Sequence, residues 1–387
     1  MKGLRWVTAG ESHGKALVGI LEGMPAGLAL DLARVDAELA RRQGGYGRGG
    51  RMKIETDRAE LLSGVRAGLT LGSPLALVIQ NRDQTIERLP VPDNPRPGHA
   101  DLAGCQRLGV ADPRAVLERA SARETTTRVA LGALARQMLE AFGIELFAHV
   151  TELGGVSAHA QAFEAAGARR HELRAASGFY CLDPAQEDAL RARVDAAREA
   201  RDTLGGVFEV RVRGLPPGLG NYANPSERLA ARLGGALFSI PAMKGVEFGL
   251  GFESARRPGS EAHDAIVPPA AAPASGSAHW GRFARATNRA GGLEGGMTTG
   301  EELVVRVAMK PIPTLRAGLP SLTFARGEPV RATYQRSDVT SVPAASVVGE
   351  AVLALELASA FLERFAGASL AELRTGFESW RDRIRSL

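Results

Sequence analysis

The segment VFEVRVR (residues 207–213) decides the fold class, because apolar and charged residues alternate along it. In an extended strand the apolar side chains occupy one face and the charged side chains the other. The apolar residues are Phe208, Val210 and Val212, and the charged residues are Glu209, Arg211 and Arg213. This pattern predicts a strand of an antiparallel sheet, with one face in the core and one face in water.

Outward from this strand, strand and helix signals are interspersed along the chain. Four more segments have strand character, at residues 4–8, 52–56, 75–80 and 302–309. They do not follow the regular order of strand, short glycine-rich turn and helix that a doubly wound parallel sheet requires. We therefore expect an α+β fold.

Capping residues mark several helix starts. Asp31 precedes a helical segment that ends at the glycines near residue 44. Asp-Pro pairs at 112–113 and 183–184 each place a capping side chain before a proline, which suits the first position of a helix. Residues 224–227, with the sequence NPSE, have the spacing of a capping-box variant.

Other helices are indicated by apolar spacing. From Leu131 to Phe142 the apolar residues recur at helical intervals, and Gly143 ends the run. Two more helical stretches are expected at residues 344–365 and 369–387. The Pro/Ala-rich segment VPPAAAPASGSAHWG (267–281) is typical of a mobile loop rather than of a linker between domains.

The composition is that of a globular protein, with 44% hydrophobic and 24% charged residues. The length of 387 residues by itself allows two or three domains. No apolar run long enough to cross a bilayer and no signal peptide are expected, which predicts a soluble cytoplasmic protein without a membrane partner. Cys105 and Cys181, the two cysteines, have no metal-site or disulfide spacing, so no metal is expected.

The charge favours anionic partners. The formal net charge is +5 and nearly all of the positive charge is on arginine, whose planar fork grips phosphates and carboxylates. The segment RRQGGYGRGGRMK (41–53) fits either a disordered arm that binds nucleic acid or a folded loop that binds a small anion. Nucleic-acid binding predicts interleaved aromatic residues, yet only 5% of the chain is aromatic and Tyr46 is the sole aromatic residue here. The folded loop is the favoured interpretation.

Four other short stretches concentrate polar chemistry. His13, within GESHG (10–14), is placed as a general acid at a strand end, although a loop histidine is more often structural. His99 lies in a proline-stiffened turn, and Asp101 after it either orients His99 or caps a helix. Residues 119–125 lie at an expected helix start, which is a favourable place for an anion. The last stretch combines KPIPT (310–314) with Arg-Ser-Asp at 336–338.

Together these stretches resemble the signature blocks of the chorismate synthase family, in the family's order and over almost the whole chain. The blocks are GESHGKALVGILEGMP (10–25), RRQGGYGRGGRMKIE (41–55), RPGHADLAG (96–104), ERASARETTTRVALG (118–132), GVEFGLGFESARRPGSEAHD (245–264), GGLEGGMTTG (291–300), KPIPT (310–314) and RSDVTSVPAASVVGEA (336–351).

The resemblance implies a layered β-α-β sandwich, with helices between antiparallel sheets, as a single large α+β domain over residues 1–387. It implies anti-1,4-elimination of phosphate from 5-enolpyruvylshikimate 3-phosphate to give chorismate, using reduced FMN with no net redox change. A cytoplasmic homotetramer without a nucleic-acid partner is implied as well. Because no separate nicotinamide domain is recognisable, we expect an external flavin reductase, with NADPH as an indirect reductant.

The resemblance also assigns roles to residues. His13 would protonate the departing phosphate, His99 the reduced flavin, and Asp338 would accept a proton near flavin N5. Five arginines would bind the substrate's phosphate and two carboxylates: Arg42, Arg48, Arg51, Arg123 and Arg336. Contacts to FMN map to Arg119, Ala120, Ser121, Pro241, Ala242, Gly295, Lys310, Pro311, Ile312, Pro313, Thr314 and Arg336.

Some points stay open at this stage. In the family the positions of Arg42 and Arg48 are also assigned to NADPH. Pro241 stands where relatives often have a polar residue, which leaves only a backbone contact to flavin there. The segment 267–281 is longer and richer in proline and alanine than expected, and either covers the site or extends into solvent. A flavin-dependent oxidoreductase with net electron turnover is the alternative enzyme class.

Overall fold

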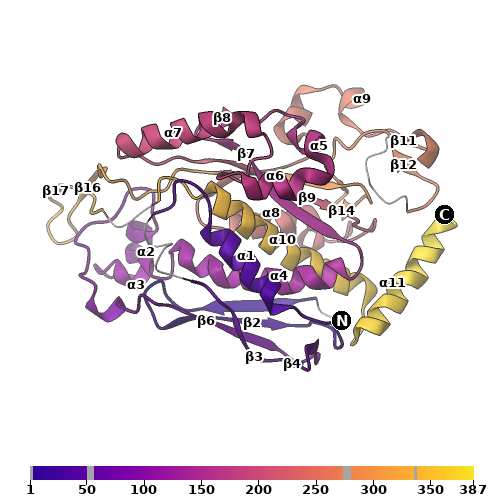
Figure 1. The fold of residues 1–387 in the computed structure, drawn as a ribbon, viewed down its shortest axis with the longest axis horizontal. Helices are drawn as coiled ribbons and strands as arrows, with labels where there is room; N and C mark the ends of the chain where they lie inside the picture. Colours follow the sequence, from indigo (N-terminus) through magenta and orange to yellow (C-terminus); the bar gives the residue numbers. More distant parts are fainter. Residues whose placement is uncertain (1–2, 50–55, 273–279, 335–337) are drawn as a thin grey trace.

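The structure is a computed structural model that describes residues 3–49, 56–272, 280–334 and 338–387. A layer of helices lies between two antiparallel sheets, and α5 (Ala162–Ala166), α6 (Arg170–Ala176) and α7 (Glu187–Glu199) lie on the far side of the five-stranded sheet (Figure 1). This arrangement confirms the expected α+β sandwich. The predicted strand at 52–56 falls almost entirely on residues outside the described ranges.

The first sheet has four strands in the order β1-β2-β6-β3, and each neighbouring pair is antiparallel. The strands are β1 (Arg5–Ala9), β2 (Ala16–Glu22), β6 (Leu75–Gln80) and β3 (Glu60–Ser63). Leu17 and Leu21 of β2 and Leu77 and Ile79 of β6 are buried towards the helices. The alternation of buried and less buried residues in β2 and β6 is the period-two pattern of a sheet with one face in the core.

The second sheet has five strands in the order β10-β15-β9-β7-β8. The strands are β10 (Met243–Phe248), β15 (Leu303–Met309), β9 (Gly206–Arg213), β7 (Glu145–Leu153) and β8 (Val156–Ser157). Val210 of β9 pairs with Val305 of β15 on one side and with Ala148 of β7 on the other. The segment that predicted an antiparallel strand is therefore an inner strand of this sheet.

Four helices occupy the layer between the sheets (Figure 1): α1 (Leu32–Gln43), α4 (Thr125–Glu140), α8 (Leu229–Phe238) and α10 (Val342–Phe365). The backbones of α4 and α10 approach closely at Gly132, where a Cβ atom would lie 2.5 Å from the carbonyl oxygen of Ala351. A larger residue at position 132 would separate the two helices. The side chain of Asp31 caps α1 by accepting from the N–H of Ala33, as predicted.

Within the described residues, α10 alone is long and apolar enough to cross a membrane, which the sequence analysis did not anticipate. Of its most apolar window, 94% is buried inside the fold. The helix therefore forms the centre of the core, and its apolar composition reflects contact with α4, α1, α8 and both β7 and β9.

Shorter elements surround these layers. The helices are α2 (Asp101–Leu108), α3 (Arg114–Leu117), α5 (Ala162–Ala166), α6 (Arg170–Ala176), α7 (Glu187–Glu199), α9 (Gly259–Ala262) and α11 (Leu370–Arg385). Small strand pairs are β4 (Val65–Arg66) with β5 (Leu69–Thr70), β11 (Ile266–Val267) with β12 (Ala284–Arg285), β13 (Leu293–Glu294) with β14 (Met297–Thr298), and β16 (Pro320–Leu322) with β17 (Pro329–Arg331).

Two local predictions are wrong. The charged face of β9 is not in water: Glu209 is only 7% exposed, and the Arg211 guanidinium lies 4.2 Å from the ring centroid of Phe163 in α5. Tertiary packing covers this face, which a strand's own pattern cannot report. Asn224 accepts no capping hydrogen bond; its side-chain amide instead donates to Glu227.

Candidate active site

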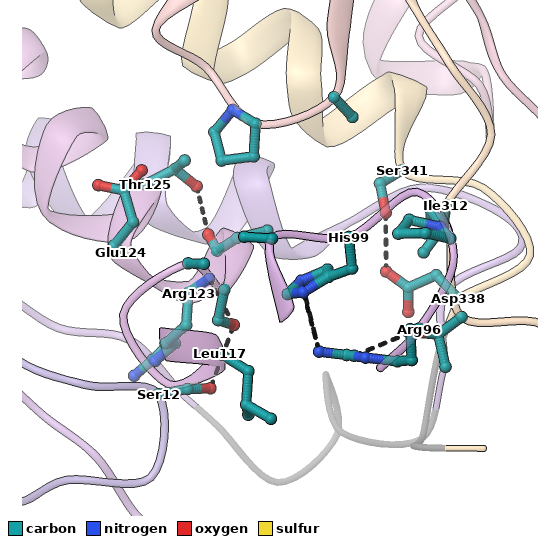
Figure 2. A pocket seen from close by; sticks show the side chains of 18 of the residues that line it. Ser12, Arg96, His99, Leu117, Arg123, Glu124, Thr125, Ile312, Asp338 and Ser341 are labelled. Atoms are coloured by element: carbon teal, nitrogen blue, oxygen red, sulfur yellow. Dashed lines mark hydrogen bonds between the residues drawn. The ribbon is translucent and has the colours of Figure 1, made fainter. Parts of the chain in front are cut away.

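A cavity of about 1720 Å³ opens where the loop after β1, the C-terminal end of α1 and the N-terminal ends of α4 and α10 meet (Figure 2). Figure 2 shows Ser12 and Arg123 on one side of it and Arg96, His99 and Asp338 on the other. Segments that are far apart in sequence thus converge on one space.

The lining of this cavity is strongly cationic. Within the described part of the chain, nine lysine or arginine side chains line it against four carboxylates. The cations are Arg42, Arg48, Arg96, Arg114, Arg119, Arg123, Arg128, Lys310 and Arg316; the acids are Asp83, Asp93, Glu124 and Asp338. A concave site with this excess of positive charge concentrates anionic ligands.

Arg42 is a buried cation of this cavity, and one of its nitrogens has no hydrogen-bond partner. It is 5% exposed, and its Nε and Nη2 atoms donate to Thr125 Oγ1 (3.1 Å) and to the carbonyl of Ala122 (2.7 Å). Its buried Nη1 atom has no hydrogen-bond partner. Burial and the neighbouring charges of Arg48 and Arg123 lower the pKa of Arg42 to about 9. A bound anion would relieve this electrostatic strain.

The adjacent Arg41 points the other way and fixes the end of α1. Its Nη2 atom lies 2.9 Å from the buried carboxylate of Glu350 in α10. Consecutive arginines therefore serve different purposes, one anchoring the helix in the core and the other entering the cavity.

The glycine-rich loop after α1 is folded. The Tyr46 hydroxyl donates to Asp195 of α7 (2.8 Å), and its ring lies 4.4 Å from the Arg191 guanidinium. Gly47 has φ +88°, a left-handed conformation that strains other residues. The described part of this loop is thus an ordered wall of the cavity, as the favoured interpretation of the sequence predicted.

Arg48 of this loop pairs with Asp338, and both residues line the cavity. The distance from Arg48 Nη1 to Asp338 Oδ2 is 2.8 Å. Asp338 Oδ1 accepts from the N–H of Gly49 (2.6 Å), and Oδ2 also accepts from the Ser341 hydroxyl (3.0 Å). The carboxylate therefore ties the loop to the start of α10.

Arg123 and Arg119 are held by different partners. Arg123 Nη1 lies 2.7 Å from Asp57 Oδ1, and its Nε donates to Asn81 (2.9 Å). The guanidinium of Arg119 donates to the carbonyls of Thr8 (2.8 Å) and Gly10 (2.9 Å). Arg119 thus anchors the end of β1, while both arginines still border the cavity.

His13 and His99 both line the cavity, and each has a carboxylate at Nδ1. The distance is 2.8 Å from His13 to Glu118 and 2.5 Å from His99 to Asp101. Asp101 also binds Arg96, whose Nε donates to Oδ2 at 2.8 Å. Burial alone would raise the pKa of Asp101, but the bonds to His99 and Arg96 reverse this and hold it well below its usual range. Asp101 is the first residue of α2, and its carboxylate orients His99.

The predicted flavin contacts are partly brought together. Arg119, Ala120, Ser121, Pro241, Ala242, Lys310, Ile312, Pro313 and Thr314 all line the cavity. The carbonyl of Ala242 accepts from the N–H of Lys310 (3.0 Å), and the Lys310 ammonium donates to the carbonyl of Gly98. Burial, and then the charge of Lys244, lower the pKa of Lys310.

Other predicted residues do not line the cavity or lie outside the described ranges. Arg51 and Arg336 lie outside the described ranges. Among the residues that the structure describes, Pro311 and Gly295 are absent from the lining. Gly295 lies in the turn between β13 and β14. The described ends of segment 267–281 adjoin β11 and β12. These strands lie at one end of the molecule's longest axis, and α2 and α3, which flank the cavity, lie at the other end (Figure 1).

Sequence reasoning missed several contributors. Arg96 lay inside a stretch that was singled out, but only His99 and Asp101 were considered there; of the two alternatives for Asp101, the structure has the one in which it contacts His99. No local sequence pattern links Asp57 to Arg123 or Glu118 to His13, because the partners are distant in sequence. Arg114 and Glu118 do have the (i, i+4) spacing of a helical ion pair, which was a usable hint.

The lining suits a ligand with both charged and flat apolar parts. Beside the cations stand apolar side chains, namely Leu89, Pro90, Val91, Pro92, Ile240, Pro241, Ile312, Pro313 and Val348. An apolar wall with a few convergent polar groups is typical of cofactor pockets. Flavin phosphate and a sugar-acid phosphate both fit this chemistry. No cluster of three or more potential metal ligands occurs in the described residues.

Comparisons with known proteins show the family of this chain. A sequence profile described as chorismate synthase matches residues 4–362. The chorismate synthase of Geobacter metallireducens is 49% identical, covering 99% of this chain and 100% of that protein. That of Trichlorobacter lovleyi is 51% identical with the same coverage. A crystal structure of chorismate synthase aligns over 100% of both chains, with a TM-score of 0.81 and 40% identity.

Proposed function

The chain belongs to the chorismate synthase family, and on this premise we propose that the cavity in Figure 2 is its active site. The reaction of the family removes phosphate from 5-enolpyruvylshikimate 3-phosphate and gives chorismate. The C–O bond to phosphate breaks, a C–H bond of the ring breaks, and a new C=C bond forms. One phosphate and one proton leave, so there is no net redox change.

The substrate is bound by cations from separate parts of the chain. Arg42, Arg48 and Arg123 enclose the anionic groups, and Arg51 and Arg336 complete the set by resemblance. Each charge-assisted hydrogen bond contributes about 1.5–3 kcal/mol. The unpartnered Nη1 atom of Arg42 supports a substrate role. We therefore assign Arg42 and Arg48 to the substrate rather than to NADPH. We also propose that an external reductase reduces the flavin.

His13 delivers a proton to the phosphate oxygen as the C–O bond breaks. Its Nδ1 atom faces Glu118, so Nε2 is the atom available to the cavity. Protonation of the leaving group lowers the charge that develops on it. After transfer the imidazole is neutral.

Reduced FMN, when bound, supplies electron density to the reacting ring and takes it back. Arg119, Ala120, Ser121, Pro241, Ala242 and the segment 310–314 would hold the flavin, with Gly295 and Arg336 added by resemblance. His99 would carry a proton on its imidazole, oriented by Asp101. The Asp338 carboxylate would accept a proton from the flavin edge.

One observation carries this proposal: His13, Arg48, His99, Arg123 and Asp338 line a single cavity although they come from five segments. The test is an anaerobic assay of chorismate formation with photoreduced FMN. His13→Ala, His99→Ala and Asp338→Ala should each lose roughly 10²–10⁴-fold in turnover. Wild-type turnover in all three would contradict the site. Stoichiometric consumption of NADPH per product would instead favour net electron turnover.

The assembly is proposed to be a homotetramer of single-domain subunits in the cytoplasm. Support comes from the outer face of the first sheet, where Val7, Val18 and Ile20 are 58%, 37% and 36% exposed. A contiguous apolar face of this kind is a frequent site of self-association. Sedimentation of Val18→Lys together with Ile20→Lys should show smaller species than the wild type. A wild type that sediments as a monomer would contradict this assembly.

A further inference from the structure

His13 lies between two carboxylates that differ in their relation to the cavity. Its Nδ1 atom is 2.8 Å from Glu118 Oε2, and its Nε2 atom is 3.9 Å from Asp83 Oδ2. Asp83 lines the cavity, whereas Glu118 does not. The Glu118 side chain is only 3% exposed, so it stands behind the imidazole and out of reach of a ligand.

Glu118 is held in place independently of His13. Its Oε1 atom accepts from Arg114 Nη1 at 2.7 Å, one helical turn earlier. Its Oε2 atom accepts from the backbone N–H of His13 (3.1 Å) as well as facing the ring. Its own carbonyl accepts from the N–H of Ser12 (3.0 Å). The loop that carries His13 is therefore bound to this residue by backbone and side chain together.

These contacts determine the ionisation of the carboxylate. Burial by itself would raise the pKa of Glu118, but the hydrogen bonds and charges of His13 and Arg114 reverse this and place the pKa below its usual value. An ionised carboxylate only accepts hydrogen bonds, so it requires a proton on His13 Nδ1. The groups facing His13 are thus Glu118, backed by Arg114, and Asp83; two acids flank the ring.

We infer that Glu118 is the positioning residue of His13: it imposes the Nδ1–H tautomer and aims Nε2 at the cavity. This inference rests on the proposed role of His13 as proton donor to phosphate. Before the reaction the ring carries protons on both nitrogens. The Nε2 proton moves to the phosphate oxygen, and the Nδ1 proton stays in the bond to Glu118.

The direct test is ¹⁵N NMR of histidine-labelled protein. The chain has 7 histidines, and His13→Ala identifies the resonances of His13 by their loss. In the wild type, neutral His13 should carry its proton on Nδ1. A neutral Nε2–H tautomer in the wild type would overturn the inference, and this readout needs no other variant to fold.

The kinetic test compares Glu118→Gln with Glu145→Gln. The carboxamide can donate to Nδ1, so the Nε2–H tautomer should appear and turnover should fall about tenfold or more. The loss should appear in kcat, with KM for the substrate nearly unchanged. Glu145 faces the exposed His171 at 3.1 Å, away from the cavity, and its variant should keep wild-type kinetics.

Each failure has a distinct signature. If His13→Ala lost activity but Glu118→Gln kept both the wild-type tautomer and the wild-type kcat, the inference would be wrong and the proposed function would stand. Wild-type turnover in His13→Ala would contradict the proposed function. The tautomer of His13 in the wild type would still show whether Glu118 positions the ring. Glu118→Asp, which keeps the charge, should recover part of the lost turnover.

Discussion

Arg48 and Asp338 form an ion pair in the lining of the proposed active-site cavity, with 2.8 Å between Nη1 and Oδ2. One residue comes from the glycine-rich loop after α1, and the other from the segment before α10. A substrate anion that binds Arg48 must share it with this carboxylate. The proposed roles of Arg48 in substrate binding and of Asp338 in proton acceptance would therefore be coupled through this ion pair.

Asp338→Asn should separate these two functions. The amide keeps the size of the side chain but removes the charge that attracts Arg48 and the ability to accept a proton. We expect kcat to fall roughly 10²–10⁴-fold while substrate affinity is unchanged or tighter. Steady-state kinetics and equilibrium binding measure the two effects. Ser341→Ala, which removes only a hydrogen bond to Asp338, should have a smaller effect on kcat; equal losses would contradict the role of the charge.

Arg42→Gln should weaken anion binding without destabilising the fold. The pKa of Arg42 is lowered to about 9, below its usual value, so at neutral pH the buried charge opposes folding, and stability should rise as pH increases above 9. Removal of the charge should leave the ligand-free melting temperature equal or higher.

Arg42→Gln should also be stabilised less by inorganic phosphate than the wild type. Inorganic phosphate should raise the melting temperature of the wild type, and the variant should need about tenfold more phosphate for the same effect. Arg34→Gln on the exposed face of α1 is the control, because Arg34 pairs with Glu140 outside the cavity. An equal response to phosphate in wild type and Arg42→Gln would exclude Arg42 as a ligand of the anion.

Tyr46 should prove to be the anchor of the glycine-rich loop. Tyr46→Phe removes the hydrogen bonds to Asp195 and should cost about 1 kcal/mol in urea unfolding, with KM almost unchanged. Tyr46→Ala also removes the ring that contacts Arg191 and Phe179, so the loop should lose its position and KM should rise. Wild-type KM in Tyr46→Ala would show that the ring does not hold Arg48 in place.

Glu209 should stabilise the fold in a pH-dependent way. Burial would raise its pKa, but His149 and Arg211 reverse this and lower it to about 2. A carboxylate with a lowered pKa stabilises the protein above its usual pKa, and the effect disappears as pH falls through about 2. Glu209→Gln should cost about 3 kcal/mol at pH 7, and the difference from wild type should shrink between about pH 5 and pH 2.

Two controls accompany this measurement by denaturant unfolding. Glu164→Gln removes an exposed partner of Arg211 and should change stability by less than about 1 kcal/mol. Turnover of Glu209→Gln should be unchanged, since Glu209 does not line the cavity. A stability difference that stays constant down to pH 2 would contradict the assigned cause.

Several features of the fold could be predicted because they depend on neighbouring residues. The Asp31 cap needs only the N–H groups of the next turn, and the strand at 207–213 shows its period of two within its own residues. The order of motif blocks, compared with a known family, was sufficient for the family and the reaction. His13, His99, Arg42 and Arg123 were all identified in this way and all line the cavity.

The partners of those residues could not be predicted. Glu118 meets His13 and Asp57 meets Arg123 only after both sheets have packed on the central helices, because no local spacing relates them. The burial of Glu209 likewise follows from α5 and Phe163 covering a face that its own strand marks as polar. Local sequence patterns predict how a residue affects the adjacent backbone. The ionisation and orientation of a side chain depend on distant groups, which only the folded chain brings within hydrogen-bonding distance.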